Sequence, residues 1–192
     1  MTETSDASRS RTGQTTAQIE LIEASDADRP VIENLAQLYQ YDFSEMSRRD
    51  LDKGHHGNVK KDGLFHNIDF DYYYGKPEHH EFIVRVDGYL AGFVLVAPGR
   101  SFRNADETVW WIDEFFVMRK YRRLGVGEHV ARAMFDRFDG VWQVAEMSIN
   151  LDAQVFWRGV IGRYTNENYE EILFDDDNWL GPVQYFRTPV AE

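Results

Sequence analysis

The sequence predicts a mixed α/β sandwich, in which strands and helices share one core. Three observations support this prediction. Two β-rich runs flank Asp87-Gly88, a dipeptide typical of a type I′ hairpin turn. The run at 109–117 is apolar apart from two acids, as expected for a strand covered on both faces. Apolar residues at helical spacing follow at 126–138, and again from residue 152.

The composition is that of one globular domain. The chain has 192 residues, of which 43% are hydrophobic and 15% aromatic. Residues 1–17 are rich in Ser and Thr, which predicts a disordered tail ahead of a single domain over 18–192. The absence of cysteine excludes disulfides, thiolate zinc sites and cysteine nucleophiles. Because the sequence has neither a long apolar run nor a secretory signal pattern, we expect a cytoplasmic protein without a membrane partner.

The charge pattern limits the class of partner. A formal net charge of −12 opposes binding to nucleic acid and favours a cationic partner. Acids are concentrated in 165–192, which is either a solvated acidic face or a rim that attracts cations. His55-His56 and His79-His80 have neither helical nor zinc-finger spacing, so no metal site is predicted.

In the N-terminal half, a weakly alternating run predicts a strand at 19–24. Ser25, the first residue of a capping-box variant, precedes a predicted helix over 26–41. Residues 42–79 have no clear periodicity, and a segment of this length without one is more often functional or mobile than inert. Tyr72–Tyr74 lie in this segment and either line a pocket or cap an edge of the core.

In the second half, strands and helices alternate. Pro98-Gly99 is expected to close one strand, while Gly140 and Gly162 are expected to end two helices. The predicted series consists of strands over 82–86, 89–96 and 109–117, a helix over 126–138, a strand over 141–148, a helix over 152–162, and strands near 169–174 and 183–188.

The stretch RRLGVG, which begins at Arg122, lies between a predicted strand and a predicted helix. Glycine lets a backbone adopt positive φ and approach a ligand closely, and free N–H groups at a helix start bind phosphate. Arg122 and Arg123 would add charge-assisted hydrogen bonds. A P-loop needs Lys-Ser or Lys-Thr after its last glycine, and a dinucleotide fingerprint needs glycine at position 130, so neither motif is present. We call residues 122–128 the cradle. The hexapeptide alone is either a pyrophosphate site or a glycine turn with surface arginines.

Together with its flanks, the cradle resembles the GNAT superfamily of N-acetyltransferases. It is similar to the Gln/Arg-x-x-Gly-x-Gly/Ala signature of that family, and Asn150, Ala153 and Phe156 are similar to its Asn-x-x-Ala-x-x-Phe segment. The resemblance covers 82–164 and is especially close to small bacterial predicted acetyltransferases. It implies a mostly antiparallel central sheet, flanked by helices and splayed between its fourth and fifth strands.

The resemblance also implies acetyl-CoA as the acetyl donor and a primary amine, small or peptide-borne, as the acceptor. Pantetheine would lie in the splay, the cradle would bind the pyrophosphate, and Asn150 would bind the pantetheine arm. Asn150 could instead be a turn residue at a strand end. The implied donor-binding residues are Phe116, Val117, Met118, Arg122, Arg123, Leu124, Gly125, Val126, Gly127, Glu128, Asn150, Phe156 and Trp157.

The expected reaction is direct attack of a neutral amine on the thioester, which requires a base. Asp113 and Glu114 are the candidates, and alternation along a strand predicts that only one faces the cleft, with Glu114 favoured. Many family members have a tyrosine seven residues after the Asn, where it can protonate the leaving thiolate. Here that position is Trp157, so Tyr164 is a candidate substitute, or alternatively a packing residue. This departure leaves open a CoA-binding sensor or interaction module without turnover. Monomer and homodimer also remain open.

Overall fold

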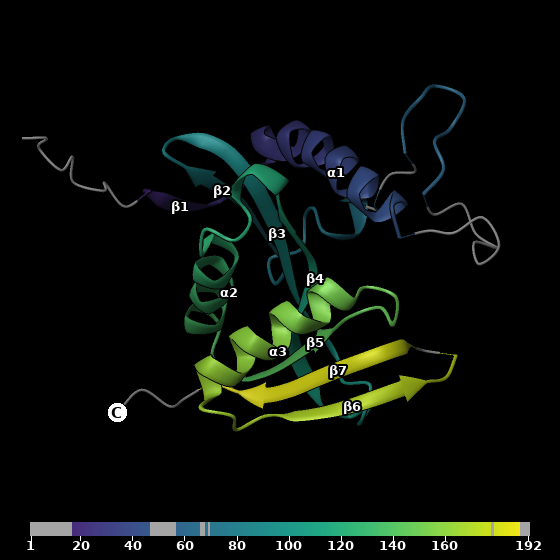
Figure 1. The fold of residues 1–192 in the computed structure, drawn as a ribbon, viewed down its shortest axis with the longest axis vertical. Coiled ribbons are helices and arrows are strands. Elements are labelled where there is room, and N and C mark those ends of the chain that lie inside the picture. The colour runs from purple at the N-terminus through teal and green to yellow at the C-terminus, as the bar shows by residue number, and fades with distance from the viewer. Residues whose placement is uncertain (1–16, 47–56, 66–67, 69, 178, 189–192) are drawn as a thin grey trace, which may run out of the picture.

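The computed structural model describes residues 17–46, 57–65, 68, 70–177 and 179–188. Apart from residue 17, the predicted tail therefore lies outside the described residues. Seven strands form one sheet in the order β1-β2-β3-β4-β5-β7-β6 (Figure 1). All neighbouring pairs are antiparallel except β4 and β5, which are parallel. The predicted class, a mixed and mostly antiparallel sheet flanked by helices, is confirmed.

The strands are β1 (Ile19–Glu23), β2 (His80–Val86), β3 (Tyr89–Arg100), β4 (Thr108–Val117), β5 (Val141–Ala145), β6 (Glu170–Asp175) and β7 (Leu180–Arg187). The helices are α1 (Arg29–Ser44), α2 (Val126–Arg137) and α3 (Leu151–Thr165). Three short 3₁₀ helices are η1 (Asp26–Asp28), η2 (Phe70–Tyr72) and η3 (Arg119–Tyr121). None of the helices in the described part of the chain is both long and apolar enough to cross a bilayer.

Several boundaries differ from the predictions. The Asp28 carboxylate accepts hydrogen bonds from the Ser25 N–H (3.0 Å) and hydroxyl (2.7 Å), as the capping-box variant predicts. However, residues 26–28 form η1, and α1 begins at Arg29. The prediction that Gly162 ends a helix was wrong, because Asn166 has the left-handed backbone (φ 52°) that ends α3. Similarly, β3 continues past Pro98-Gly99 to Arg100, and β5 ends at Ala145, earlier than predicted.

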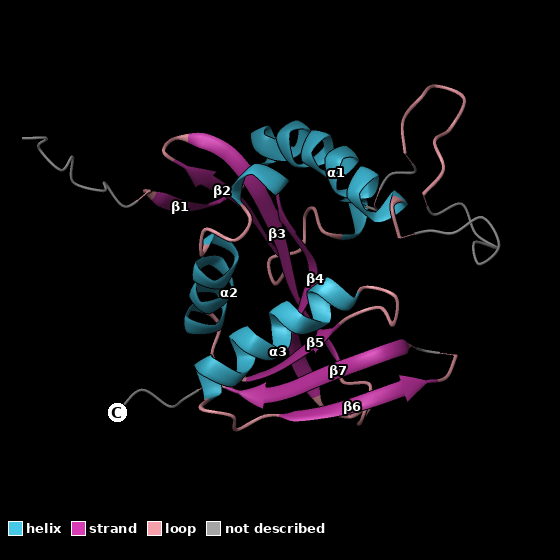
Figure 2. Cartoon of the chain, in the orientation of Figure 1, coloured by secondary structure: helices cyan, strands magenta, loops and turns pink. Residues whose placement is uncertain are grey.

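Helices cover both faces of the sheet (Figure 2). On one face, which we call the α1 face, α1 and η2 pack on one set of alternate strand residues: Ile83, Phe93, Leu95 and Phe116. On the other, the α3 face, α2 and α3 lie side by side on the intervening residues, which include Phe82, Val84, Val94 and Val96. Since side chains alternate along a strand, the two cores lie on opposite sides of the sheet.

The sheet opens between β4 and β5. These parallel strands pair only at Trp110–Trp142 and Trp111–Gln143. From Ile112 to Val117, β4 continues without a β5 partner. Figure 1 shows β6 and β7 running across the direction of β3, which places the two parts of the sheet on either side of the opening. The splay implied by the resemblance is therefore present.

Candidate functional site

The cradle reverses the chain between η3 and α2. Arg123 (φ 59°) and Gly125 (φ 80°) both have left-handed backbone, which glycine adopts without steric cost. Within the described residues, the N–H groups of residues 123–128 donate to no acceptor. The first N–H of this region with a partner is that of His129, which donates to the Gly125 carbonyl at 3.0 Å. Unpaired N–H groups at a helix start, with the positive end of the helix dipole, are suited to an anion.

Gly127 lies against an aromatic side chain of α3. A Cβ added at Gly127 would be 3.1 and 3.2 Å from ring atoms of Phe156. Phe156 in turn packs on Phe115 of β4, with 5.8 Å between ring centroids. Trp157 is only 6% exposed and meets the Phe115 ring edge-on at 4.9 Å. Phe156 and Trp157 thus lie in the aromatic packing that joins the cradle to β4 and α3.

The two cradle arginines have different surroundings. Arg122 donates from Nε to the Val117 carbonyl at 2.7 Å and from Nη2 to Asp42 of α1. Arg123 is exposed and has no side-chain partner within the described residues. Arg123 is therefore the guanidinium available to a ligand, whereas Arg122 already binds protein groups.

The remaining cradle side chains have different surroundings. Leu124 is 66% exposed, while Val126 is buried in the core of the α3 face. The Glu128 carboxylate accepts two hydrogen bonds from Arg163, at 2.9 and 2.7 Å, and these lower the pKa of Glu128. Each of these residues could contact an anion through its backbone N–H.

The backbone of β4 offers a free edge to the splay. The Met118 N–H donates to the Ala91 carbonyl at 2.8 Å, and a Cβ added at Gly92 would be 1.9 Å from the Phe116 carbonyl oxygen. The backbone N–H and C=O groups of Phe116 and Met118 therefore point toward β3. Alternate residues of a strand direct their backbone groups to opposite edges. The backbone N–H and C=O groups of Phe115 and Val117 therefore point toward the splay. Phe115 was not among the predicted donor-binding residues, because the β3–β4 register decides which backbone groups point toward the splay.

Asn150 is the N-cap of α3. Its Oδ1 accepts a hydrogen bond from the Ala153 N–H at 3.2 Å. Its amide nitrogen has no partner among the described residues. The structure thus gives Asn150 a capping role at the carboxyl end of β5 and leaves one of its polar groups available.

The prediction that Asp113 and Glu114 point to opposite faces was wrong. Leu95 pairs with Glu114, and Val96 pairs with Ile112, so Asp113 is the extra residue of a β-bulge. A bulge interrupts the alternation of side chains along a strand. As a result, both carboxyl groups lie on the α1 face.

Two tyrosines of the α1 face contact this pair. Glu114 has a side-chain hydrogen bond with Tyr39 of α1, and Asp113 has one with Tyr73. Burial raises the pKa of Asp113 to about 6 and that of Glu114 to about 7, while each tyrosine hydrogen bond opposes this rise. The charge of Asp113 raises the pKa of Glu114 further. A carboxyl group that titrates near neutral pH can accept a proton from a reacting amine. Neither tyrosine was a predicted site residue, since both contacts depend on how α1 and η2 pack on the sheet.

Tyr164 lies on the α3 face, away from this pair. Its hydroxyl donates to Asp136 at 2.9 Å, and its ring packs on Phe135 at 5.1 Å between centroids. Burial and the Asp136 contact raise the pKa of Tyr164 above its ordinary value. Asp136 is ten residues along α2 from Val126, about 15 Å from the cradle end of the helix. The structure therefore does not bring Tyr164 together with the candidate bases.

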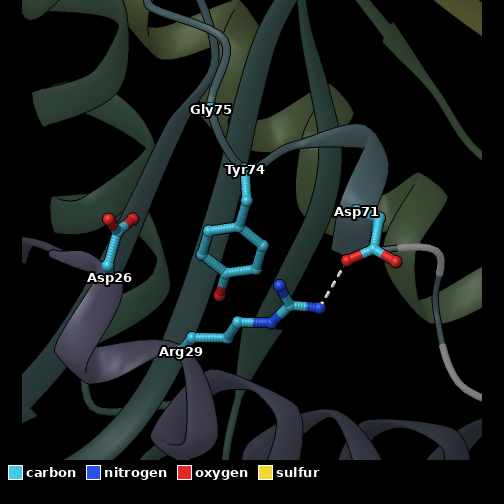
Figure 3. Close-up of a pocket in the computed structure, with 5 residues that line it drawn as sticks. All are labelled: Asp26, Arg29, Asp71, Tyr74 and Gly75. Atoms are coloured by element: carbon cyan, nitrogen blue, oxygen red, sulfur yellow. Dashed lines mark hydrogen bonds and ion pairs between the residues drawn. The ribbon is translucent and has the colours of Figure 1, made fainter.

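A separate hollow lies where α1 begins, lined by Asp26, Arg29, Asp71, Tyr74 and Gly75 (Figure 3). Arg29 donates to Asp71 at 2.6 Å, and its guanidinium lies 4.5 Å from the centroid of the Tyr74 ring. The hollow contains none of the predicted site residues, and its arginine is already paired. In the described residues, no group of three or more His, Cys, Asp or Glu side chains could hold a metal ion. His55-His56 lies outside them.

Comparison with known proteins agrees with this geometry. The sequence model of the acetyltransferase (GNAT) family matches residues 36–160. The fold is similar to that of a GNAT family acetyltransferase from Streptococcus agalactiae 2603, with a TM-score of 0.60, 10% identity, and coverage of 91% of this chain and 96% of that chain. It is similar to an acetyltransferase from Thermus thermophilus, with a TM-score of 0.58, 11% identity, and coverage of 90% and 98%. A third similar structure is an aminoglycoside acetyltransferase from an uncultured soil metagenomic sample, in complex with sisomicin, with a TM-score of 0.53, 12% identity, and coverage of 82% and 93%. A search of curated protein sequences finds no match.

Proposed function

Because the chain belongs to the acetyltransferase (GNAT) family, whose members take the acetyl group from acetyl-CoA, we propose that it acetylates a primary amine. The observation that supports this most strongly is the position of the cradle. The cradle, which has unpaired N–H groups, is separated only by Met118 and η3 from the end of β4, whose edge lacks a β5 partner. An anion-binding turn beside an open strand edge suits a ligand that has both a pyrophosphate and an extended amide chain.

In this proposal, the N–H groups of residues 123–128 and the guanidinium of Arg123 bind the pyrophosphate. The pantetheine amides bond to the β4 edge at Phe115 and Val117, as an added strand would. The free amide nitrogen of Asn150 binds the pantetheine arm from the other side of the splay. Arg122 contributes through its backbone and through the Val117 carbonyl that it holds.

Glu114 is the proposed base. It takes a proton from the acceptor ammonium, and the neutral amine then attacks the carbonyl carbon of the thioester. A backbone N–H of β4 stabilises the oxyanion. The attacking nitrogen then loses its second proton to solvent, and the carbon–sulfur bond breaks with its electron pair on sulfur. Solvent protonates the thiolate, because the Trp157 indole cannot act as that acid. Asp113, on the same face, favours an acceptor that carries positive charge, in agreement with a net charge of −12.

A second candidate is a CoA-binding module without turnover. The observation that favours it is Trp157, a buried core residue. Many family members have at this position a tyrosine that can protonate the leaving thiolate. The two candidates agree on the donor and differ only in whether an amine releases CoA thiol.

Thermal unfolding in the presence of nucleotides tests donor binding. We expect millimolar acetyl-CoA and CoA to raise the Tm, because a ligand that binds only the folded state stabilises it. ATP and NAD should leave the Tm unchanged. Arg123→Gln should reduce the shift, since it removes the free cradle cation. No shift with acetyl-CoA or CoA would contradict both candidates.

A further inference from the structure

The last turn of α1 lies against the cradle. Asp42 accepts a hydrogen bond from Arg119 Nε at 2.8 Å and another from Arg122 Nη2. Arg119 also donates from Nη2 to Glu45 at 2.6 Å. Asp42 is thus the carboxylate through which α1 contacts both the first residue of η3 and the first residue of the cradle.

The position of Asp42 is unfavourable for the helix alone. The carboxyl end of a helix has a partial negative charge, which favours basic side chains in the last turn. The last turn of α1 has no basic residue, and Asp42 lies close to its end. A local rule broken in this way indicates that a tertiary contact keeps the residue there.

Burial distinguishes Asp42 from its neighbour. The Asp42 side chain is 15% exposed, whereas that of Glu45 is 72% exposed. Ion pairs at exposed positions contribute little, and partly desolvated ones with several hydrogen bonds contribute more. Asp42 is also the one of the two that contacts Arg122.

Arg122 connects three parts of the site. Its Nη2 contacts Asp42, its Nε contacts the Val117 carbonyl at the end of β4, and its own backbone begins the cradle. The next residue, Arg123, has a left-handed backbone (φ 59°), which is unfavourable for a residue other than glycine. Such a conformation persists when neighbouring contacts restrain the chain, and the Arg122 contacts are immediately adjacent to it.

The same helix, α1, also contacts the proposed base, Glu114 of β4. Tyr39, which contacts Glu114, precedes Asp42 by three residues and therefore lies on the same side of α1. We infer that Asp42 is a positioning residue for the acetyl-CoA site: it holds Arg122 as a link between α1, β4 and the cradle, so that the cradle N–H groups are ordered before the donor binds. This inference rests on the proposed function.

Asp42→Asn tests the inference, with Glu45→Gln as the matched control. Both substitutions remove one negative charge at the C-terminal end of α1 and one charged partner of Arg119. We expect Asp42→Asn to raise the KM for acetyl-CoA about tenfold, which corresponds to about 1.4 kcal/mol, with kcat and the amine KM within about twofold. Glu45→Gln should change the acetyl-CoA KM less than twofold. In an Arg122→Gln background, Asp42→Asn should have no further effect, because residues that act through one contact are not additive.

An unchanged or lower acetyl-CoA KM in Asp42→Asn would overturn the inference, and so would additive effects in the double variant. If Asp42→Asn does not fold, the acetyl-CoA KM of Arg122→Gln is compared with that of Glu45→Gln. Arg122→Gln breaks the link between Asp42 and the cradle but leaves Asp42 paired with Arg119. An equal acetyl-CoA KM in these two variants would then overturn it. A wild-type protein that fails to bind acetyl-CoA would instead contradict the proposed function.

Discussion

A single extra residue in β4 determines how Asp113 and Glu114 act together. Strict alternation predicts that one of them faces the core of the opposite side, but the bulge places both on the α1 face. There both carboxyl groups are half-buried, and this partial burial raises both pKa values. Bulges depend on the pairing of two strands and have no clear signature in one strand, so this arrangement could not be predicted from the sequence.

Substitution of the two carboxyl groups separates their roles. Glu114→Gln should lower kcat by about 100-fold or more, because it removes the proposed general base. Asp113→Asn keeps that base and should lower kcat less than about tenfold. Steady-state kinetics with one amine at saturating acetyl-CoA measures both effects. Equal losses in the two variants, or none in either, would contradict the assignment of the base to Glu114.

The contact with Tyr39 predicts a shift in pH dependence. Wild-type kcat/KM should rise with pH, with its midpoint at about pH 7, as Glu114 loses its proton. The Tyr39 hydrogen bond stabilises the carboxylate, so Tyr39→Phe should raise the pKa of Glu114 and move this limb about one unit to higher pH. Tyr73→Phe is the control, because its contact is with Asp113. A limb that stays in place in Tyr39→Phe would show that another group titrates.

At the scale of elements, the cradle was the most predictable part of the site. Its glycines have local reasons that can be inferred from the sequence: Gly125 has positive φ, and Gly127 lies in the first turn of a helix. Its tertiary contacts have no such signal. Neither the link from Arg122 to Asp42 nor the packing of Phe156 on Gly127 follows from spacing along the chain.

Gly125→Ala tests whether this backbone conformation serves the donor. The substitution places a Cβ at φ 80°, at a cost of about 1–2 kcal/mol. If part of the strain is relieved by rearrangement of the cradle, the KM for acetyl-CoA should rise about tenfold. Gly88→Ala is the matched control: it has φ 78° and, like Gly125, no atom that a Cβ would touch, but it lies in the β2–β3 hairpin. A similar change in the KM for acetyl-CoA in both variants would contradict a specific role for Gly125.

For the whole molecule, the class of fold, the hairpin and the splayed sheet were predictable because each has a local pattern or a family motif. The segment over 42–79 was not, since its described residues between α1 and β2 contain only η2 as a helix and pack through single aromatic side chains such as Phe70 and Tyr73. The Tyr73 contact with Asp113 shows why this matters, because it brings a residue distant in sequence to the proposed acceptor side of the site.

Glu146 should make stability depend on pH. It is 3% exposed, and one carboxyl oxygen accepts from Gln184 at 3.1 Å while the other has no partner within the described residues. Burial raises the pKa of Glu146 to about 8. The folded state therefore binds an extra proton between about pH 4.5 and 8, and the free energy of unfolding falls as the pH rises through this range.

Glu146→Gln cannot ionise, so its free energy of unfolding should exceed that of the wild type at pH 9, by a few kcal/mol at most, and match it near pH 4. Denaturant unfolding at a series of pH values measures this difference. Glu171→Gln should behave in the opposite way, because the Arg158 hydrogen bond lowers the pKa of Glu171 and stabilises the fold above its ordinary titration range. A constant difference between Glu146→Gln and the wild type across pH would show that Glu146 keeps one protonation state.

Amine-dependent release of CoA thiol from acetyl-CoA tests the central proposal most directly. Purified protein would be incubated with acetyl-CoA and a panel of cationic primary amines, small and peptide-borne, at about pH 8, with Glu114→Gln in parallel. We predict thiol release that requires both the protein and at least one amine, and that falls about 100-fold or more in Glu114→Gln. Saturable acetyl-CoA binding with no amine-dependent thiol from any member of the panel would contradict it and favour a CoA-binding module.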